Sequence, residues 1–177
     1  MNKFAVLLRG INVGGIKLAM VDLRNIAESL GYAGATTILA TGNLLVKTDE
    51  SAEVVKQRVC AGLSEHMQMP MRCLVRSKAQ IERLAGEATA VPEGYHHYII
   101  FCDAPILDEL LTLFSGYATS EGETLYKTSD DLHWIVKKGD TLKGFGSAVL
   151  GSRKYQSVLT SRNLNTVEKI AQGLNAL

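Results

Sequence analysis

The order in which short apolar runs and helical stripes follow one another restricts the fold of this chain more than any other feature of the sequence. Residues 4–8 form an unbroken apolar run, long enough for one buried strand and too short for a helix. Over residues 20–30 apolar side chains recur at helical spacing, and Gly31 stands where a left-handed C-terminal cap is expected. The sequence therefore predicts a strand, a polar turn and a helix at its start.

The rest of the first half continues this order. Further predicted elements are strands over 36–41, 44–48 and 71–76 and helices over 51–67 and 77–84. Gly42-Asn43, between two runs of β-branched and apolar residues, predicts a tight hairpin. Ser77 and Gln80 fit a capping box at the start of the short third helix. Strand, helix, strand, strand, helix, strand is the order of the split βαβ, or ferredoxin-like, sandwich.

Residues 86–94, which contain Pro92 and show no periodicity, form the predicted linker. The elements predicted beyond it are strands over 95–102, 124–128 and 132–138, a helix over 103–114, a broken helix over 148–157 and a terminal helix over 164–174. This order allows the second half to be interpreted as a degenerate copy of the first, in element order and not in sequence. We therefore predict an α+β fold of two ferredoxin-like halves: 1–86, which carries the glycine-rich turn, and 95–177, which ends in the terminal helix.

Composition and charge restrict the class of protein. The formal net charge is +1, which gives no global electrostatic reason for binding nucleic acid or an anionic membrane, so any basic site must be local. No apolar run approaches the roughly 18 residues of a membrane span, and the first residues lack a signal-peptide cleavage site. Cys60, Cys73 and Cys102 are widely spaced among apolar neighbours, which favours free thiols in a reducing compartment. We expect a cytoplasmic protein without a membrane partner.

Residues 9–17, between the first predicted strand and helix, combine three glycines with Arg9, Asn12 and Lys17. Glycine lets the backbone adopt left-handed conformations and approach a ligand closely. A glycine-rich turn between a strand and a helix can present backbone N–H groups to an anion, and the two cations add to that attraction. A connection with incidental charges explains the same residues about equally well.

A second polar tract is expected beside this turn. In a split βαβ sandwich the first two strands run the same way, which places residues 9–17 and 41–43 at one edge of the sheet. Taken alone, Gly42 and Asn43 are explained by the hairpin. Their predicted neighbourhood is what favours a functional role.

The third polar tract, 160–166, lies at the predicted start of the terminal helix, where Ser161 or Asn163 can serve as N-cap. Arg162 is disfavoured near the positive end of a helix dipole unless an anion binds there. Ligand contact and plain exposure are equally good explanations of Arg162. We expect the three tracts to meet at one corner of the folded chain.

Three phrases of the sequence are distinctive together: LLRGINVGG at 7–15, TGN at 41–43 and TSRNLNTV at 160–167. With them the chain resembles, over essentially its whole length, a bacterial family catalogued as a domain of unknown function, number sixteen ninety-seven. The resemblance implies two ferredoxin-like halves and no particular activity. Its hallmark residues would fall on Arg9, Gly10, Asn12, Gly14, Gly15, Thr41, Gly42, Asn43, Arg162, Asn163, Asn165 and Thr166.

The chain departs from the family pattern at two positions, 41 and 164. The family usually has Ser where Thr41 stands and Trp where Leu164 stands. If that Trp stacks on a ligand ring, the resemblance implies weaker or different binding by this chain. The candidate ligand-binding residues are the hallmark residues together with Lys17 and Ser161.

Several chemistries are not supported by the sequence. Gly10 and Gly15 have the separation of a P-loop, but Ile16 occupies the Lys position and Leu18 follows Lys17. The four histidines form no ligand spacing with the cysteines, and His96 and His97 should point to opposite faces of one strand, one exposed and one in the core. We expect neither a metal nor another cofactor.

The three tracts contain Arg, Lys, Asn, Ser, Thr and Gly, but no Asp, Glu, His or Cys. Such groups hold negative charge and do not shuttle protons near neutral pH, so binding is better supported than catalysis and the question of an enzyme stays open. The first hypothesis is a pocket for an anionic small ligand that carries phosphate, a nucleotide among the candidates.

The alternative is a module that binds RNA or single-stranded nucleic acid, because ferredoxin-like sheets can stack bases. The strands over 4–8 and 44–48 carry one aromatic residue, Phe4, and the RNP1 string is absent, whereas the second half has Tyr98, Phe101, Tyr126 and Trp134. A third class, a scaffold acting through protein contacts, leaves no mark in the sequence. Apolar edge strands would permit a dimer without demanding one, so the oligomeric state stays open.

Overall fold

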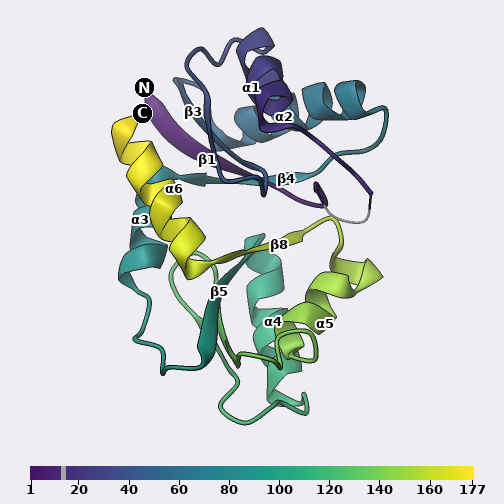
Figure 1. The fold of residues 1–177 in the computed structure, drawn as a ribbon, viewed down its shortest axis with the longest axis vertical. Helices are drawn as coiled ribbons and strands as arrows, with labels where there is room; N and C mark the ends of the chain where they lie inside the picture. The colour runs from purple at the N-terminus through teal and green to yellow at the C-terminus, as the bar shows by residue number, and fades with distance from the viewer. Residues whose placement is uncertain (13–14) are drawn as a thin grey trace. The chain divides into compact units, whose positions relative to one another are not determined.

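A computed structural model describes residues 1–12 and 15–177, and the contacts of the chain divide it into two units (Figure 1). The first unit comprises Met1–Glu82 and Glu168–Leu177, and the second comprises Arg83–Val167. Each unit contains one four-stranded antiparallel sheet with flanking helices. The α+β fold class and its two ferredoxin-like halves are therefore confirmed.

The first unit is built around β1 at the centre of its sheet. Its elements are β1 (Asn2–Leu8), α1 (Met20–Ser29), β2 (Thr36–Ile38), β3 (Asn43–Thr48), α2 (Ala52–Met67), β4 (Cys73–Ser77) and the start of α3 (Lys78–Gly86). The strand order is β2-β3-β1-β4, and β1 pairs antiparallel with both β3 and β4. This is the order of the split βαβ sandwich, with β1 and β2 running the same way.

Local signals set the ends of the helices in this unit. Ser51 Oγ accepts a hydrogen bond from Val54 N at 3.3 Å and caps α2. At the start of α3, Ser77 N donates to Gln80 Oε1 at 2.9 Å and Gln80 N donates to Ser77 Oγ at 3.3 Å. The predicted capping box is therefore confirmed.

The predicted tight hairpin at Gly42-Asn43 is wrong. Ile38 pairs with Asn43, so β2 is shorter than predicted and the connection is a loop over residues 39–42. Leu39, with φ 57°, and Gly42, with φ 75°, take the left-handed conformations that close this loop. Asn43 is the first residue of β3, and its buried Nδ2 donates to Ile38 O and Thr41 Oγ1, both at 2.9 Å.

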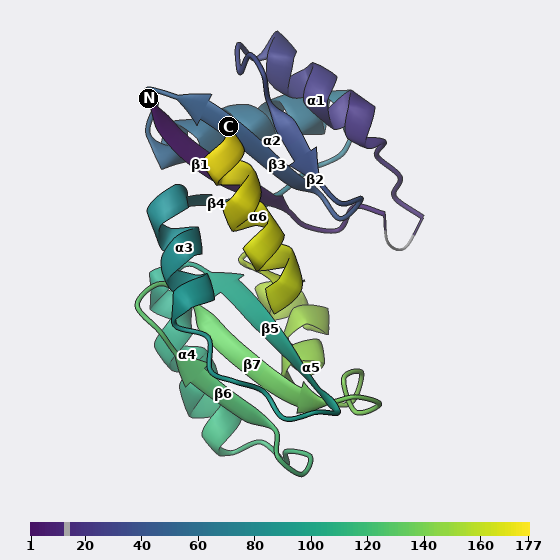
Figure 2. The same cartoon turned by 60° about the vertical axis from the view of Figure 1, so that its left-hand side comes forward.

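The second unit repeats this arrangement. Its elements are β5 (Tyr95–Cys102), α4 (Ala104–Ser115), β6 (Thr124–Lys127), β7 (Leu132–Lys137), α5 (Phe145–Gly151), a 3-10 turn (Arg153–Tyr155), β8 (Leu159–Asn163) and the start of α6 (Leu164–Ala176). The strand order is β6-β7-β5-β8, which matches that of the first unit, and Figure 2 shows β5, β7 and β6 side by side.

Strand β8 was not predicted. Its sequence, LTSRN, reads as a polar tract before a helix, but it pairs antiparallel with β5 along its whole length. The second half is therefore more complete than the predicted order of strand, helix, strand, strand, helix. A polar edge strand is recognised through its partner and not through its own composition.

Strands β4 and β8 correspond residue by residue. Arg76 pairs with Ala5 and Arg162 pairs with Ile99, each one residue before the end of its strand. Both side chains are 8% exposed. Arg76 Nη1 donates to Val75 O at 3.0 Å and Arg162 Nη1 donates to Ser161 O at 2.7 Å. The two units thus share their edge-strand geometry as well as their strand order.

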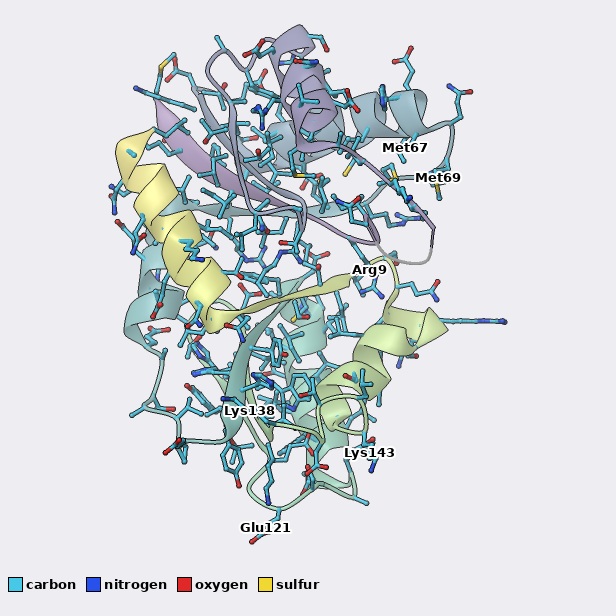
Figure 3. All side chains as sticks on the ribbon, in the orientation of Figure 1. Arg9, Met67, Met69, Glu121, Lys138 and Lys143 are labelled. Atoms are coloured by element: carbon cyan, nitrogen blue, oxygen red, sulfur yellow. The ribbon has the colours of Figure 1, made fainter. Side chains whose placement is uncertain are left out.

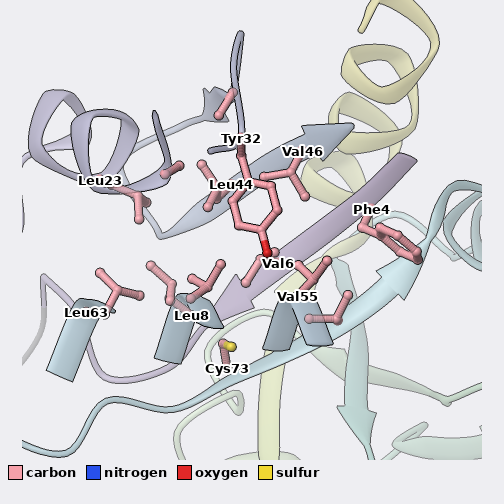
Figure 4. Packing of buried hydrophobic residues seen from close by; sticks show 14 of the residues in the cluster. Phe4, Val6, Leu8, Leu23, Tyr32, Leu44, Val46, Val55, Leu63 and Cys73 are labelled. Carbon is pink, nitrogen blue, oxygen red and sulfur yellow. The ribbon is translucent and has the colours of Figure 1, made fainter. Parts of the chain in front are cut away.

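One face of each sheet packs on helices to form a core. In the first unit, Val6, Leu8, Leu44 and Val46 of the sheet belong to one buried cluster with Leu23 of α1 and Val55 and Leu63 of α2 (Figure 4). In the second unit, the buried cluster joins Ile100, Leu132, Trp134 and Val136 to Leu107 and Leu110 of α4 and Phe145 of α5. Burial of these side chains supplies the main favourable term in the stability of each unit.

The division between the units falls inside α6, because Glu168–Leu177 groups with the first unit. A Cβ built at Gly173 would lie 2.7 Å from Leu45 Cδ1 and 3.0 Å from Ile38 Cδ1. A glycine at this position thus lets α6 approach β2 and β3 closely. The predicted halves had placed the whole helix with residues 95–177.

Among the helices in the part of the chain that the structure describes, none is long and apolar enough to cross a membrane.

Candidate functional site

The glycine-rich turn after β1 is closed by hydrogen bonds of Asn12. Asn12 N donates to Ile16 O at 2.7 Å, and Asn12 itself has a φ of 56°. Its side chain accepts from Leu18 N at 3.1 Å and donates to Ala40 O at 2.7 Å. Asn12 therefore fixes the turn and joins it to the loop between β2 and β3. The candidate Gly14 lies outside the described residues.

The first two polar tracts meet in the first unit, as the order of strands predicted. Leu8 N donates to Gly42 O at 2.8 Å. A Cβ built on Gly42 would lie 2.6 Å from Ile11 Cδ1, so the two tracts touch with no space for a larger residue. Gly42 and Asn43 thus have structural roles that are independent of a ligand.

The remaining candidates of these tracts are nearer the surface. Gly10, with φ 74°, and Gly15, with φ 88°, are exposed and use the left-handed conformation that glycine allows. Lys17 and Thr41 are exposed. Arg9 is half-buried, and this burial lowers the pKa of its guanidinium from the usual value.

The third tract lies in the second unit. Asn163 Oδ1 accepts from Asn165 N at 3.0 Å and caps α6, as predicted. Ser161 is a strand residue that pairs with Ile100. That these candidates act together with residues 9–17 and 41–43 stays a prediction.

Plain exposure, one of the two explanations given for Arg162, is wrong, whereas contact with a ligand stays a prediction. Arg162 belongs to β8 and is buried, and its Nη1 donates to Thr160 Oγ1 at 2.9 Å. Burial lowers the pKa of its guanidinium to about 10. At neutral pH this side chain remains a buried cation, so its charge is held inside the second unit.

A pocket of about 660 Å³ opens at the N-terminal end of α6, within the second unit. Four segments line it: residues 89–91 of the linker, 95–97 of β5, Lys138 and 163–166. Three predicted residues, Asn163, Asn165 and Thr166, are among them. This volume falls in the range of small-molecule sites.

The other walls of the pocket consist of residues that were not predicted to belong to a site. Tyr95, His96 and His97 come from the start of β5, and Lys138 follows the end of β7. Lys138 is held beside β5 because its N–H donates to Gly94 O at 2.8 Å, one step beyond the pairing of Tyr95 with Lys137 (Figure 3). These residues come together through the pairing of β5 with β7, and the register of that pairing could not be predicted from the sequence.

His97 forms the buried end of the pocket lining and is linked to His133. His97 is 5% exposed, and its Nε2 lies 2.8 Å from His133 Nδ1. The outer nitrogens, Nδ1 of His97 and Nε2 of His133, are buried and have no hydrogen-bond partner among the described residues. Buried polar atoms without partners are rare and often mark a place for water or a ligand. His97 lies in the core as predicted, but His96 is half-buried and not exposed.

Both histidines of this pair are neutral at physiological pH. Burial lowers the pKa of His97, and burial followed by the proximity of His97 lowers the pKa of His133 to about 4. One proton then lies between the two rings, so one outer nitrogen is an N–H donor and the other is an acceptor. The pair therefore has one donor and one acceptor left at its two outer nitrogens.

The lining of the pocket favours an anion. Lys138 is an exposed cation, the N-terminus of α6 carries the positive end of a helix dipole, and none of the described lining residues is acidic. Tyr95 and Leu164 add apolar surface. Among the described residues no group of three His, Cys, Asp or Glu side chains is placed to hold a metal ion.

Comparison with known proteins agrees with this fold. A comparison with curated proteins finds no match. A solved structure of a conserved bacterial protein from Streptococcus pneumoniae is similar, with a TM-score of 0.82 and 21% sequence identity over 99% of each chain. This likeness concerns the fold. A family model described as protein of unknown function (DUF1697) matches residues 1–132. The chain therefore belongs to this family of proteins of unknown function, DUF1697.

Proposed function

We propose that this protein binds a small ligand that carries phosphate, a nucleotide being the leading candidate, in the pocket at the start of α6. The observation that carries the proposal is the lining itself: a cation, a helix N-terminus and amide and hydroxyl groups surround about 660 Å³, and none of the described lining residues is acidic. Phosphate oxygens accept hydrogen bonds, and the side-chain NH₂ groups of Asn163 and Asn165 and the hydroxyl of Thr166 can donate them.

The two ends of the pocket suit the two ends of such a ligand. Lys138 and the backbone of 163–166 would hold the phosphate. Tyr95 and Leu164 would lie along a planar or apolar part of the ligand. Leu164 supplies less ring-stacking surface than an aromatic residue would, which favours moderate affinity.

The cations of the glycine-rich turn, Arg9 and Lys17, belong to the first unit and form a separate candidate contact. Asn12, Gly42 and Asn43 hold the turn and the neighbouring loop. The predicted contribution of this turn to ligand binding is therefore assigned to Arg9, Lys17 and the exposed backbone of Gly10 and Gly15.

Nucleic-acid binding across the sheets is the less supported alternative. Phe101 is fully buried, Trp134 is 1% exposed and stacks on Tyr98 at a centroid distance of 5.2 Å, and Tyr126 stacks on His133 at 4.7 Å. Rings that pack on one another in this way are not free to stack on bases.

Thermal shift and calorimetric titration test the proposal. The probes are inorganic phosphate and a panel of nucleoside mono-, di- and triphosphates, with the unphosphorylated nucleosides as controls. We expect at least one phosphate-bearing probe to raise the unfolding temperature in a saturable manner, while its nucleoside does not.

Lys138→Ala should weaken that binding about tenfold, because one charge-assisted contact is lost. Lys143→Ala is the matched control, since Lys143 is exposed in the same loop and does not line the pocket (Figure 3). A panel without any saturable response, or an equal loss in both variants, would overturn the proposal.

A further inference from the structure

Two cysteines of the first unit lie side by side. Cys60 is on α2 and Cys73 is the first residue of β4, and their Sγ atoms are 2.8 Å apart. Both are free thiols. The third cysteine, Cys102, ends β5 in the second unit and is buried.

Local hydrogen bonds hold the two sulfur atoms together. Ser64 Oγ donates to Cys60 O at 2.6 Å and accepts from Met71 N at 2.8 Å, which ties the last turns of α2 to the segment entering β4. Cys73 is fixed in the sheet by its pairing with Leu8. The sulfur pair therefore needs no rearrangement of the chain to react.

The two thiols differ in access. Cys73 is 5% exposed and packs in the apolar core, where Figure 4 shows its sulfur among the buried side chains. Cys60 is half-buried at the edge of that core. A small reagent from solvent can therefore reach Cys60 more easily than Cys73, which is buried.

The two thiols also differ in acidity. The hydrogen bond from Cys73, supported by the charges of Lys56 and Arg72, lowers the pKa of Cys60 to about 7. The same contact and burial raise the pKa of Cys73. The pair thus combines one thiol that ionises more readily with one that stays protonated, which are the two partners that disulfide formation requires.

We propose that Cys60 and Cys73 form a reversible intramolecular disulfide when the protein meets a peroxide. The Cys60 thiolate attacks one peroxide oxygen, the O–O bond breaks, and the leaving hydroxide takes a proton to become water. Cys60 is then a sulfenic acid. The sulfur of Cys73 attacks the Cys60 sulfur, and the hydroxyl group leaves with the Cys73 proton as a second water.

The electrons balance in this sequence. The two thiols together lose two hydrogens and two electrons, and hydrogen peroxide is reduced to two waters. A dithiol reductant reverses the change by exchange with the disulfide. The bond would link α2 to β4 directly and would restrain the unfolded chain between them.

The test is oxidation of the folded full chain with a small excess of hydrogen peroxide, followed by thiol counting and peptide mapping. We expect the wild-type protein to keep one free thiol of three, to lose the mass of two hydrogens, and to yield a peptide pair joined through Cys60 and Cys73. Its unfolding temperature should rise by a few degrees, and a dithiol should restore the starting value.

Three variants separate this disulfide from general oxidation. Cys102→Ser should still form the linked peptide, Cys60→Ser should not, and Cys73→Ser should accumulate a sulfenic acid at Cys60 that a 1,3-diketone probe traps. Three remaining thiols in the wild type, or a linkage that includes Cys102, would overturn the proposal. The wild-type peptide map alone decides the matter if a variant does not fold. No part of this test uses the ligand pocket.

Discussion

His97 Nε2 and His133 Nδ1 share a hydrogen bond of 2.8 Å in the interior of the second unit, and the outer nitrogen of each ring is buried without a partner in the described part of the chain. In the first unit the position equivalent to His133 is Leu45, because Ala5 pairs with Leu45 as Ile99 pairs with His133. The second unit therefore places a polar pair where the first has an apolar residue.

Because of this histidine pair, we expect the folded protein to become less stable in mild acid. The pKa of His133 is about 4 in the folded chain and near 6.5 when unfolded, so the unfolded state binds more protons between these values. The free energy of unfolding should fall as the pH drops from about 6.5 to 4, by about 3 kcal/mol from this residue. His133→Leu should flatten the pH profile measured by urea unfolding. Equal slopes in the wild type and His133→Leu would show that the pair does not titrate in this way.

Asn12→Ala should destabilise the first unit. The change removes the side-chain hydrogen bonds to Leu18 N and Ala40 O, and alanine tolerates the φ of 56° less well than asparagine. We expect a loss of about 1–2 kcal/mol in the free energy of unfolding, measured by urea denaturation. Asn12→Asp keeps the acceptor for Leu18 N but lacks the donor to Ala40 O. Its free energy of unfolding should therefore fall by less than that of Asn12→Ala. If Asn12→Ala were as stable as the wild type, the side chain of Asn12 would not stabilise the turn as described.

Gly42→Ala and Gly34→Ala separate backbone strain from steric conflict. Gly42 has φ 75° and Gly34 has φ 73°, so both substitutions incur a similar strain of about 1 kcal/mol. At Gly42 the new Cβ would meet Ile11 Cδ1 at 2.6 Å and Leu8 Cβ at 2.8 Å, whereas a Cβ built at Gly34 has no neighbouring atom of the described residues within 4 Å. The loss at Gly42 should exceed that at Gly34 by about 1–3 kcal/mol in thermal or urea unfolding. Equal losses would mean that the two tracts do not pack as closely as described.

Gly173→Val should loosen the attachment of the last turns of α6 to the first unit. A Cβ at this position lies 2.7 Å from Leu45 Cδ1, and the branched side chain cannot fit without moving β3 or the helix. Amide hydrogens of residues 168–177 should exchange faster in the variant. Gly151→Ala, where no atom lies within 4 Å of the new Cβ, is the control and should leave that exchange unchanged.

The element order could be predicted because its signals are local. The capping box of Ser77 and Gln80 and the cap formed by Ser51 depend on residues three apart, and the strand over 95–102 carries its own apolar pattern. Strand β8 was missed because a polar edge strand depends on its pairing with β5. The hairpin was misplaced because the left-handed conformation of Leu39 leaves no mark in the sequence.

The candidate site was predicted only in part for a similar reason. Asn163, Asn165 and Thr166 carry the polar signature of a helix start and do line the pocket. Lys138 and His97 lie in the same pocket because of the register between β5 and β7. The sequence around either residue does not indicate this register. Arg162 was misjudged because its burial follows from β8.

Two-dimensional amide NMR of the labelled protein, titrated with the best phosphate-bearing probe and then with its unphosphorylated nucleoside, tests the proposed pocket most directly. Saturable shifts in the amides of residues 163–166 and Lys138, produced by the phosphate-bearing probe alone, are the predicted result. Shifts confined to other parts of the chain, or equal shifts from the nucleoside, would contradict an anion site at the start of α6.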